Sequence, residues 1–185
     1  MSSASHLKNK ARAMARAARA SLSSPDVGTS LIDHFPAHFT QKRIAGFSPI
    51  QDEINIWPLL HKLNHLGRTI ALPVTTGPNS PLSFRRWTPG CEMQADQYGV
   101  MTPIGTRQIK PELILVPLLA FTGSGARLGY GGGYYDRTLT ALRAQSEVFA
   151  CGVAYAGQEV ASLPTDEHDE HLDGILTEDG FRSFK

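Results

Sequence analysis

Short apolar runs that alternate with helical patterns limit the possible folds of this chain more strongly than any other feature. The runs are rich in leucine and β-branched residues, and the segments between them repeat apolar residues at helical spacing. Strands separated by helices favour parallel pairing, because the crossover helix returns the chain to the starting edge of the sheet. We therefore predict an α/β fold, a three-layer α/β/α sandwich with a largely parallel sheet, as a single domain over residues 1–185. The expected strands are 43–47, 69–73, 82–87, 113–117, 148–153 and, last, 174–177, with a polar connection over 88–110, and the expected helices after a basic N-terminal helix are 26–39, 52–66 and 134–143.

Six glycines lie between the strand at 113–117 and the helix at 134–143. Glycine allows a positive φ and lets a ligand approach backbone N–H groups closely, and the following helix N-terminus adds unpaired donors and a positive dipole end. The loop matches neither the P-loop, since no lysine follows the glycines, nor a strict GxGxxG motif. A flexible turn is the alternative. The interleaved Arg127, Tyr130, Tyr134 and Tyr135 favour a phosphate-binding loop instead.

Asp136 lies in the first turn of the helix that follows this loop. A bare carboxylate there would repel a nucleotide phosphate, but Mg²⁺ commonly binds one or two carboxylates together with phosphate oxygens. The alternative is that Asp136 only complements the helix dipole, as many acids in a first turn do. The residue by itself leaves both interpretations open.

Composition argues against several classes of protein. The chain has 18 basic and 17 acidic residues, which gives no support to a nucleic-acid-binding protein. No apolar run approaches the length of a membrane span. Cys91 and Cys151 form no CxxC or metal-binding spacing, so we expect reduced thiols and a cytoplasmic protein.

Residues 1–25 contain no acid and several arginines, a composition that would suit a transit peptide. Lys8, Arg12, Arg16 and Arg19 nevertheless recur at helical spacing on one stripe, as expected of a helix that faces an anion or of a solvated basic face. The spacing by itself leaves these alternatives open, and it is the resemblance to a known family, given next, that implies a segment belonging to the domain, with residues 1–7 as a short extension.

The chain from Leu119 to Asp136 resembles the signature of the 5-formyltetrahydrofolate cyclo-ligase family. The matching residues are Leu119-Ala120-Phe121, Gly125, and Arg127-Leu128-Gly129-x-Gly131-x-Gly133-Tyr134-Tyr135-Asp136. The resemblance implies a three-layer α/β sandwich, small-molecule substrates, ATP as co-substrate and Mg²⁺ as cofactor. It also implies ATP contacts from a helix with the pattern Lys-x-x-x-Arg and from the glycine-rich loop, here Lys8, Arg12, Arg127, Leu128, Gly129, Tyr130, Gly131, Gly132, Gly133, Tyr134 and Tyr135.

The resemblance implies ligand-binding roles for acids in two segments. Acids at a helix start, such as Glu53, are usually structural, but the resemblance implies that Glu53 binds the pterin of the folate, with Ser48, Tyr130 and Tyr134 nearby. The loop 164–173 would by itself be interpreted as a solvated surface turn. The resemblance implies that Asp169 joins Asp136 in holding Mg²⁺.

Other residues of these segments receive no ligand role. We expect Asp173 to be structural, and the neighbouring His168 and His171 are not expected to bind the hard Mg²⁺ ion. No residue is assigned as a general acid or base. The chain also departs from the family pattern at Thr122, where aspartate is common, and at Tyr130 and Gly132, where some members carry basic residues.

The resemblance implies ATP- and Mg²⁺-dependent cyclisation of 5-formyltetrahydrofolate to 5,10-methenyltetrahydrofolate through an N5-iminium phosphate. We expect the enzyme to be a monomer. One alternative is a folate- or nucleotide-binding relative without turnover, which the threonine at position 122 suggests. Another, of a different class, is a nucleic-acid-binding module that uses the basic N-terminal helix.

Overall fold

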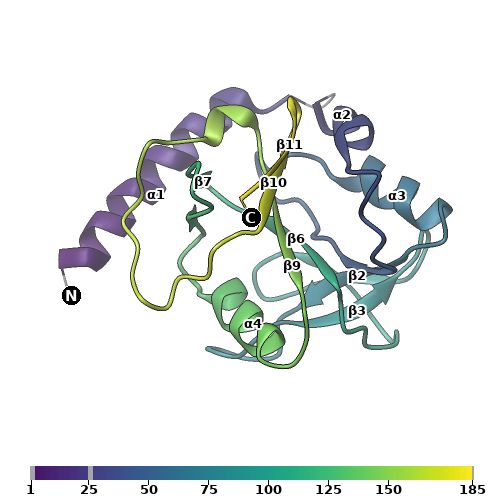
Figure 1. Ribbon diagram of the computed structural model, residues 1–185. Helices are drawn as coiled ribbons and strands as arrows, with labels where there is room; N and C mark the ends of the chain where they lie inside the picture. The colour runs from purple at the N-terminus through teal and green to yellow at the C-terminus, as the bar shows by residue number, and fades with distance from the viewer. Residues whose placement is uncertain (1–2, 25–26, 185) are drawn as a thin grey trace.

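The computed structural model describes residues 3–24 and 27–184, which form a mixed seven-stranded sheet flanked by helices (Figure 1). The strand order is β11-β10-β9-β6-β1-β2-β3, with parallel pairing from β10 through β2 and antiparallel pairing at both edges. The largely parallel sheet is therefore confirmed. The strands of this sheet are β1 (Arg43–Ala45), β2 (Thr69–Val74), β3 (Ser83–Trp87), β6 (Leu113–Pro117), β9 (Phe149–Val153), β10 (Gly174–Thr177) and β11 (Gly180–Ser183).

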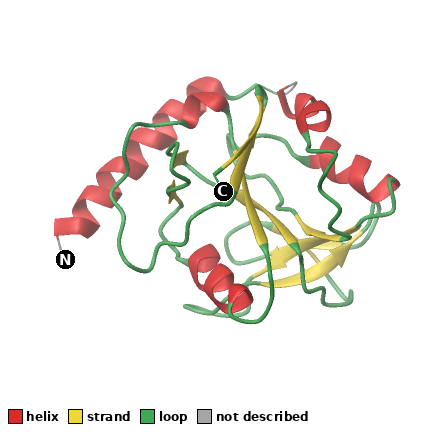
Figure 2. Ribbon diagram, in the orientation of Figure 1, coloured by secondary structure: helices red, strands yellow, loops and turns green. Residues whose placement is uncertain are grey.

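Helices cover both faces of the sheet, as Figure 2 shows. On one face α2 (Val27–His34) and α3 (Trp57–His65) bury their apolar residues against Ile44 and Ile70. On the other face α4 (Tyr134–Arg143) packs against Ala45 and Ala71, the next residues along the same strands. Successive strand residues point to opposite faces, so an apolar strand without alternation needs a layer on each side. The predicted three-layer sandwich is confirmed.

Helix α1 (Ser3–Leu22) lies beside the C-terminal half of the chain (Figure 1). Leu22 packs against Gly157 of the short 3₁₀ helix η1 (Ala156–Gln158), and the loop that follows η1 runs along the helix. The basic N-terminal segment is thus a helix of the fold, and residues 3–7 continue it.

Several expected boundaries were wrong. The second helix ends at His34, just before Pro36, which cannot donate a backbone hydrogen bond; the expected first residue, 26, lies outside the described residues. The third helix begins at Trp57 and not at residue 52. A turn precedes it, in which Gln51 has a φ of 51° and the Ile50 amide donates to the Glu53 carboxylate. This turn keeps Glu53 out of the helix.

Five strands were not predicted from the sequence. The strand at 174–177 is not the last, because β11 follows it as an antiparallel edge. The polar connection 88–110 contains the hairpin of β4 (Met93–Ala95) and β5 (Met101–Pro103). The glycine-rich segment contains the hairpin of β7 (Ala120–Phe121) and β8 (Arg127–Leu128). Over residues 3–24 and 27–184, no helix is long and apolar enough to cross a membrane.

Candidate active site

A cavity of about 1340 Å³ opens where β1, β2 and β6 end. Phe47 and Ser48 follow β1, Thr75 follows β2 and Pro117 closes β6, and all of them line the cavity. Parallel strands end at one edge of the sheet. Where the connections leave neighbouring strands in opposite directions, they open a crevice at this edge that commonly binds ligands. Every residue predicted to bind ATP, folate or metal lines this cavity, namely Lys8, Arg12, Ser48, Glu53, Arg127, Leu128, Gly129, Tyr130, Gly131, Gly132, Gly133, Tyr134, Tyr135, Asp136 and Asp169.

The glycine-rich loop reaches the cavity from the β7–β8 hairpin. The Thr122 hydroxyl accepts a hydrogen bond from the Ala126 amide at 3.2 Å and contacts the Ser124 hydroxyl at 2.9 Å. Threonine therefore holds the hairpin turn by a side-chain bond to the backbone, as an Asx- or ST-type turn does. Beyond β8, Gly131 has a φ of 102° and Gly133, with a φ of 64°, is the N-cap residue of α4.

The N-terminus of α4 faces the cavity without a capping side chain from the described part of the chain. The first amides of a helix have no intrahelical partner, so they are free to bind an anion, and the helix dipole favours negative charge at this end. The glycine-rich loop and α4 together therefore form a phosphate-binding geometry.

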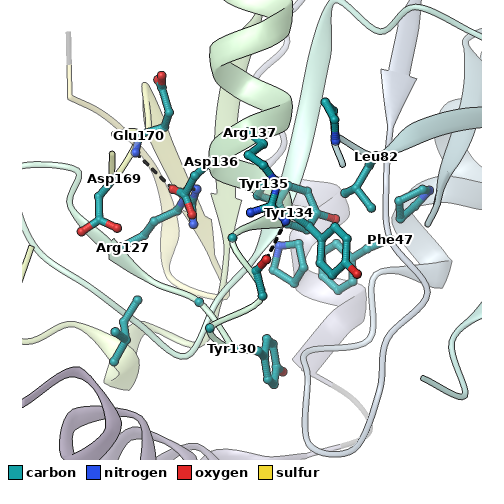
Figure 3. A pocket seen from close by; sticks show the side chains of 18 of the residues that line it. Phe47, Leu82, Arg127, Tyr130, Tyr134, Tyr135, Asp136, Arg137, Asp169 and Glu170 are labelled. Carbon is teal, nitrogen blue, oxygen red and sulfur yellow. Dashed lines mark hydrogen bonds and ion pairs between the residues drawn. The ribbon is translucent and has the colours of Figure 1, made fainter. Parts of the chain in front are cut away.

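Asp136 and Asp169 lie at the charged end of the cavity, together with Arg127 and Glu170 (Figure 3). The Asp136 carboxylate accepts hydrogen bonds from the Arg127 guanidinium at 2.6 Å and from the Glu170 amide at 3.1 Å. The Arg127 side chain is almost fully buried, so this ion pair fixes the position of the carboxylate.

Lys8 joins α1 to the acidic loop. Its ammonium group donates to both oxygens of Asp169, at 2.8 and 2.6 Å, and to Asp166 at 2.7 Å. Burial by itself would lower the pKa of Lys8, but the hydrogen bonds and charges of Asp166 and Asp169 outweigh it and raise this pKa. Lys8 thus stays cationic and neutralises the acidic loop.

The donor set at this end suits Mg²⁺. Two carboxylates converge from α4 and the acidic loop, and Mg²⁺ completes an octahedral shell with water and phosphate oxygens and needs no all-protein cage. Among the described residues, no three His, Cys, Asp or Glu side chains are grouped so that they could hold a metal ion. One oxygen of Asp136 accepts both bonds from Arg127 and the Glu170 amide, which leaves the other for a metal.

Glu53 lies at another part of the cavity wall with its side chain 6% exposed. Its Oε1 accepts a hydrogen bond from the Tyr130 hydroxyl at 2.5 Å, and its Oε2 accepts from the Ile50 amide at 3.0 Å. Burial raises the pKa of Glu53, and the Tyr130 hydrogen bond, the Ile50 amide and the Arg19 charge partly oppose this rise. Each oxygen keeps one lone pair for a ligand, since a carboxylate offers four acceptor positions.

The predictions missed Arg19 and Tyr98 as site residues. Arg19 donates to the Tyr130 hydroxyl at 2.5 Å from behind the cavity wall; its place on the basic stripe of α1 was the only sequence signal. Tyr98, from the β4–β5 hairpin, lines the cavity, and its hydroxyl lies 2.9 Å from that of Tyr134. The polar stretch that contains Tyr98 gave no signal, because only the tertiary fold brings the hairpin to the cavity.

A model of the 5-formyltetrahydrofolate cyclo-ligase family matches residues 5–178. The chain belongs to this family. A 5-formyltetrahydrofolate cyclo-ligase of Haemophilus influenzae is 34% identical over 141 residues, 73% of this chain and 75% of the relative. The cyclo-ligase of Escherichia coli K12 is 30% identical over 149 residues, 77% of this chain and 81% of the relative.

The solved structure of an Aquifex aeolicus 5,10-methenyltetrahydrofolate synthetase has the same fold, with a TM-score of 0.81 at 28% identity. The match covers 97% of this chain and 93% of the synthetase. The cyclo-ligase family predicted from the glycine-rich signature is confirmed, and so are the α/β fold and the prediction that the chain is an enzyme of this class.

Proposed function

We propose that the protein catalyses the ATP- and Mg²⁺-dependent cyclisation of 5-formyltetrahydrofolate to 5,10-methenyltetrahydrofolate, with release of ADP and phosphate. The observation that carries this proposal is the composition of one cavity. It joins an uncapped helix N-terminus and four cationic side chains to a buried carboxylate with free acceptor positions. A phosphate and a paired N–H edge of a pterin would thus meet in the same space.

The nucleotide would lie against the glycine-rich loop and α1. Arg12 donates from Nε to the Gly129 carbonyl at 3.1 Å, so one guanidinium edge braces the loop. Lys8 lies one helical turn away, and Arg127 lies beside the start of α4. These cations, with the backbone amides of Gly129 to Tyr135, would neutralise and orient the transferred phosphoryl group, which is the main task of a protein in phosphoryl transfer.

Asp136 and Asp169 would hold Mg²⁺ at the charged end of the cavity. When bound, the ion would supply positive charge to the phosphate oxygens. Asp169 would then exchange its contacts with Lys8 for the ion, which would free the ammonium group to bind phosphate.

The folate would bind at Glu53, with Ser48 close by, Tyr130 bridging to the loop and Tyr134 offering its ring. The formyl oxygen on N5 attacks the γ-phosphorus of ATP, which forms an N5-iminium phosphate and releases ADP. N10 then attacks the activated carbon, and loss of phosphate, which takes up the N10 proton, closes the methenyl bridge. The chain contributes positioning and charge neutralisation to these steps, and no general base is assigned.

The structure favours this proposal over a nucleic-acid-binding module. Lys8 and Arg12 line the cavity, and Arg16 and Arg19 place their guanidinium groups 5.6 and 5.5 Å from the centre of the Tyr130 ring. The basic stripe of α1 is thus directed toward the cavity. We further propose that the chain acts as a single-domain monomer in the cytoplasm.

The test is to mix the purified protein with 5-formyltetrahydrofolate and Mg-ATP and to follow the near-ultraviolet absorbance of the methenyl product. We expect absorbance to grow only when ATP and Mg²⁺ are both present, and to stop growing in Asp136→Ala. Mg-ATP binding without product would identify the alternative, a relative that binds its ligands without turnover. No binding of folate or ATP would contradict the proposal altogether.

A further inference from the structure

The burial of Arg19 is energetically unfavourable for this fold. Its side chain is 1% exposed, and among the described residues its Nε and Nη2 atoms have no hydrogen-bond partner. Unpaired buried donors are rare because no hydrogen bond offsets the free energy of removing them from water. This free energy is larger for a guanidinium than for a neutral group. An aliphatic residue would fill the same space in α1 without this cost, so packing does not explain the charge.

The Arg19 side chain makes one hydrogen bond within the described residues, and its partner is a cavity residue. Its Nη1 donates to the Tyr130 hydroxyl at 2.5 Å, and the same hydroxyl donates to Glu53 Oε1 at 2.5 Å. Since the hydroxyl oxygen accepts from Arg19, its proton is directed to the carboxylate. Nη1 itself lies 3.8 Å from Glu53 Oε1, close enough for direct charge attraction in a buried environment.

We propose that Arg19 is a positioning residue for the folate end of the cavity, which keeps the buried Glu53 carboxylate charged and aligned through the Tyr130 hydroxyl. This inference rests on the proposed function in one respect, the assignment of Glu53 to the folate. A charged Glu53 accepts two N–H donors, whereas a protonated one loses an acceptor position. Arg19 therefore widens the pH range over which the site binds its ligand.

Arg19 is the cation that acts on Glu53 within the described part of the chain. Tyr130 faces Glu53 from the glycine-rich loop and Tyr135 from α4, and the third protein contact is the backbone amide of Ile50. Burial and the Glu53 charge raise the pKa of both phenols, so neither becomes an anion at neutral pH. Burial raises the pKa of Glu53, and Arg19 acts against that rise.

The test compares Arg19→Gln, which can still donate a hydrogen bond but has no charge, with Arg19→Lys, which keeps the charge. The Glu53 carboxyl carbon is followed by ¹³C NMR over a pH titration and assigned with Glu53→Gln. Binding of 5-formyltetrahydrofolate and of Mg-ATP is measured over the same pH range. Circular dichroism establishes that each variant is folded.

We expect Arg19→Gln to move the Glu53 titration to higher pH and to weaken folate binding at neutral pH about tenfold or more, the scale of one hydrogen bond to a charged group. Mg-ATP binding should stay within about twofold, since one lost contact at the folate end does not reach the phosphates. Arg19→Lys should titrate close to the unmodified protein. A purely structural role would move the folding midpoint and leave the Glu53 titration in place.

An unchanged Glu53 titration in folded Arg19→Gln would overturn the inference. If that variant does not fold, Arg19→Met replaces it, because it fills the same buried space and removes the charge. Here too the Glu53 titration should move to higher pH, and an unmoved titration would overturn the inference. Failure of the proposed function is a separate result, in which the unmodified protein binds no folate at any pH while the Glu53 titration still responds to Arg19.

Discussion

Replacing Asp173 by asparagine should lower the free energy of unfolding by about 3 kcal/mol, the lower end of the range for removing one partner of a buried ion pair. The Asp173 carboxylate is 3% exposed and accepts from Arg143 Nη2 at 2.9 Å and from the Ala150 amide at 2.7 Å. Asparagine keeps the volume but removes the charge. The lower end of the range applies because Arg143 is 26% exposed and also pairs with Glu170, so it keeps a second partner.

For a chain of this length, 3 kcal/mol corresponds to a fall of roughly 6–12 °C in the thermal midpoint. Urea denaturation and a thermal melt by circular dichroism measure the change. Methenyl product formation at low temperature, where the variant stays folded, should remain within about threefold of the unmodified rate, because Asp173 does not line the cavity.

Asp169→Asn is the matched control, since it lies four positions earlier in the same loop. Asp169 is 21% exposed and pairs with Lys8 near solvent, so its loss should cost about 1 kcal/mol or less. It should, however, abolish Mg²⁺-dependent turnover. The reasoning is refuted if Asp173→Asn loses less than about 1 kcal/mol or if the two variants lose equal stability.

Three further predictions concern the charged end of the cavity. Asp136→Asn should reduce the turnover rate at least about 100-fold at saturating Mg-ATP, the scale of lost metal-assisted charge stabilisation; an unchanged rate would exclude Asp136 as a ligand. Gly131→Ala should raise the KM for ATP about tenfold, because φ is 102° and the new Cβ would lie 3.1 Å from Arg12 Cζ; a wild-type KM would show that the loop adapts. The hydrogen bond and charge of Lys8 lower the pKa of Asp166 below its ordinary value, so their link stabilises α1 above the ordinary value and is lost as the pH falls through the lowered one. The protection factors of the α1 amides, corrected for the intrinsic exchange rate at each pH, should fall on acidification, and Lys8→Met should show lowered protection already at neutral pH.

The glycine-rich loop could be predicted from the sequence because its chemistry is local. Backbone positions with positive φ call for glycine, a helix start follows from the apolar spacing after Tyr134, and Asp136 is fixed in the first turn. The helix indeed runs from Tyr134 to Arg143. The parallel strands were equally predictable, since a strand covered on both faces must be apolar throughout.

The start of α3 shows where local patterns failed. Acids at residues 52 and 53 before an apolar periodic run are typical of a helix start. The chain instead forms a turn stabilised by the Glu53 side chain and buries Ile54 and Ile56 before the helix begins. That outcome depends on the space left between α2 and the sheet, which no pattern within the segment encodes.

The sequence by itself determined the α/β class, the glycine-rich loop before α4 and the family, because strand and helix periodicity and glycine spacing act between near neighbours. Only the tertiary structure decided which charges meet. Lys8 reaches Asp169 across 161 positions of the chain, and Arg19 reaches Tyr130 across 111. Such pairs form when packed elements bring distant residues within a few ångströms. The same packing decides how burial and neighbouring charges shift the pKa of each group.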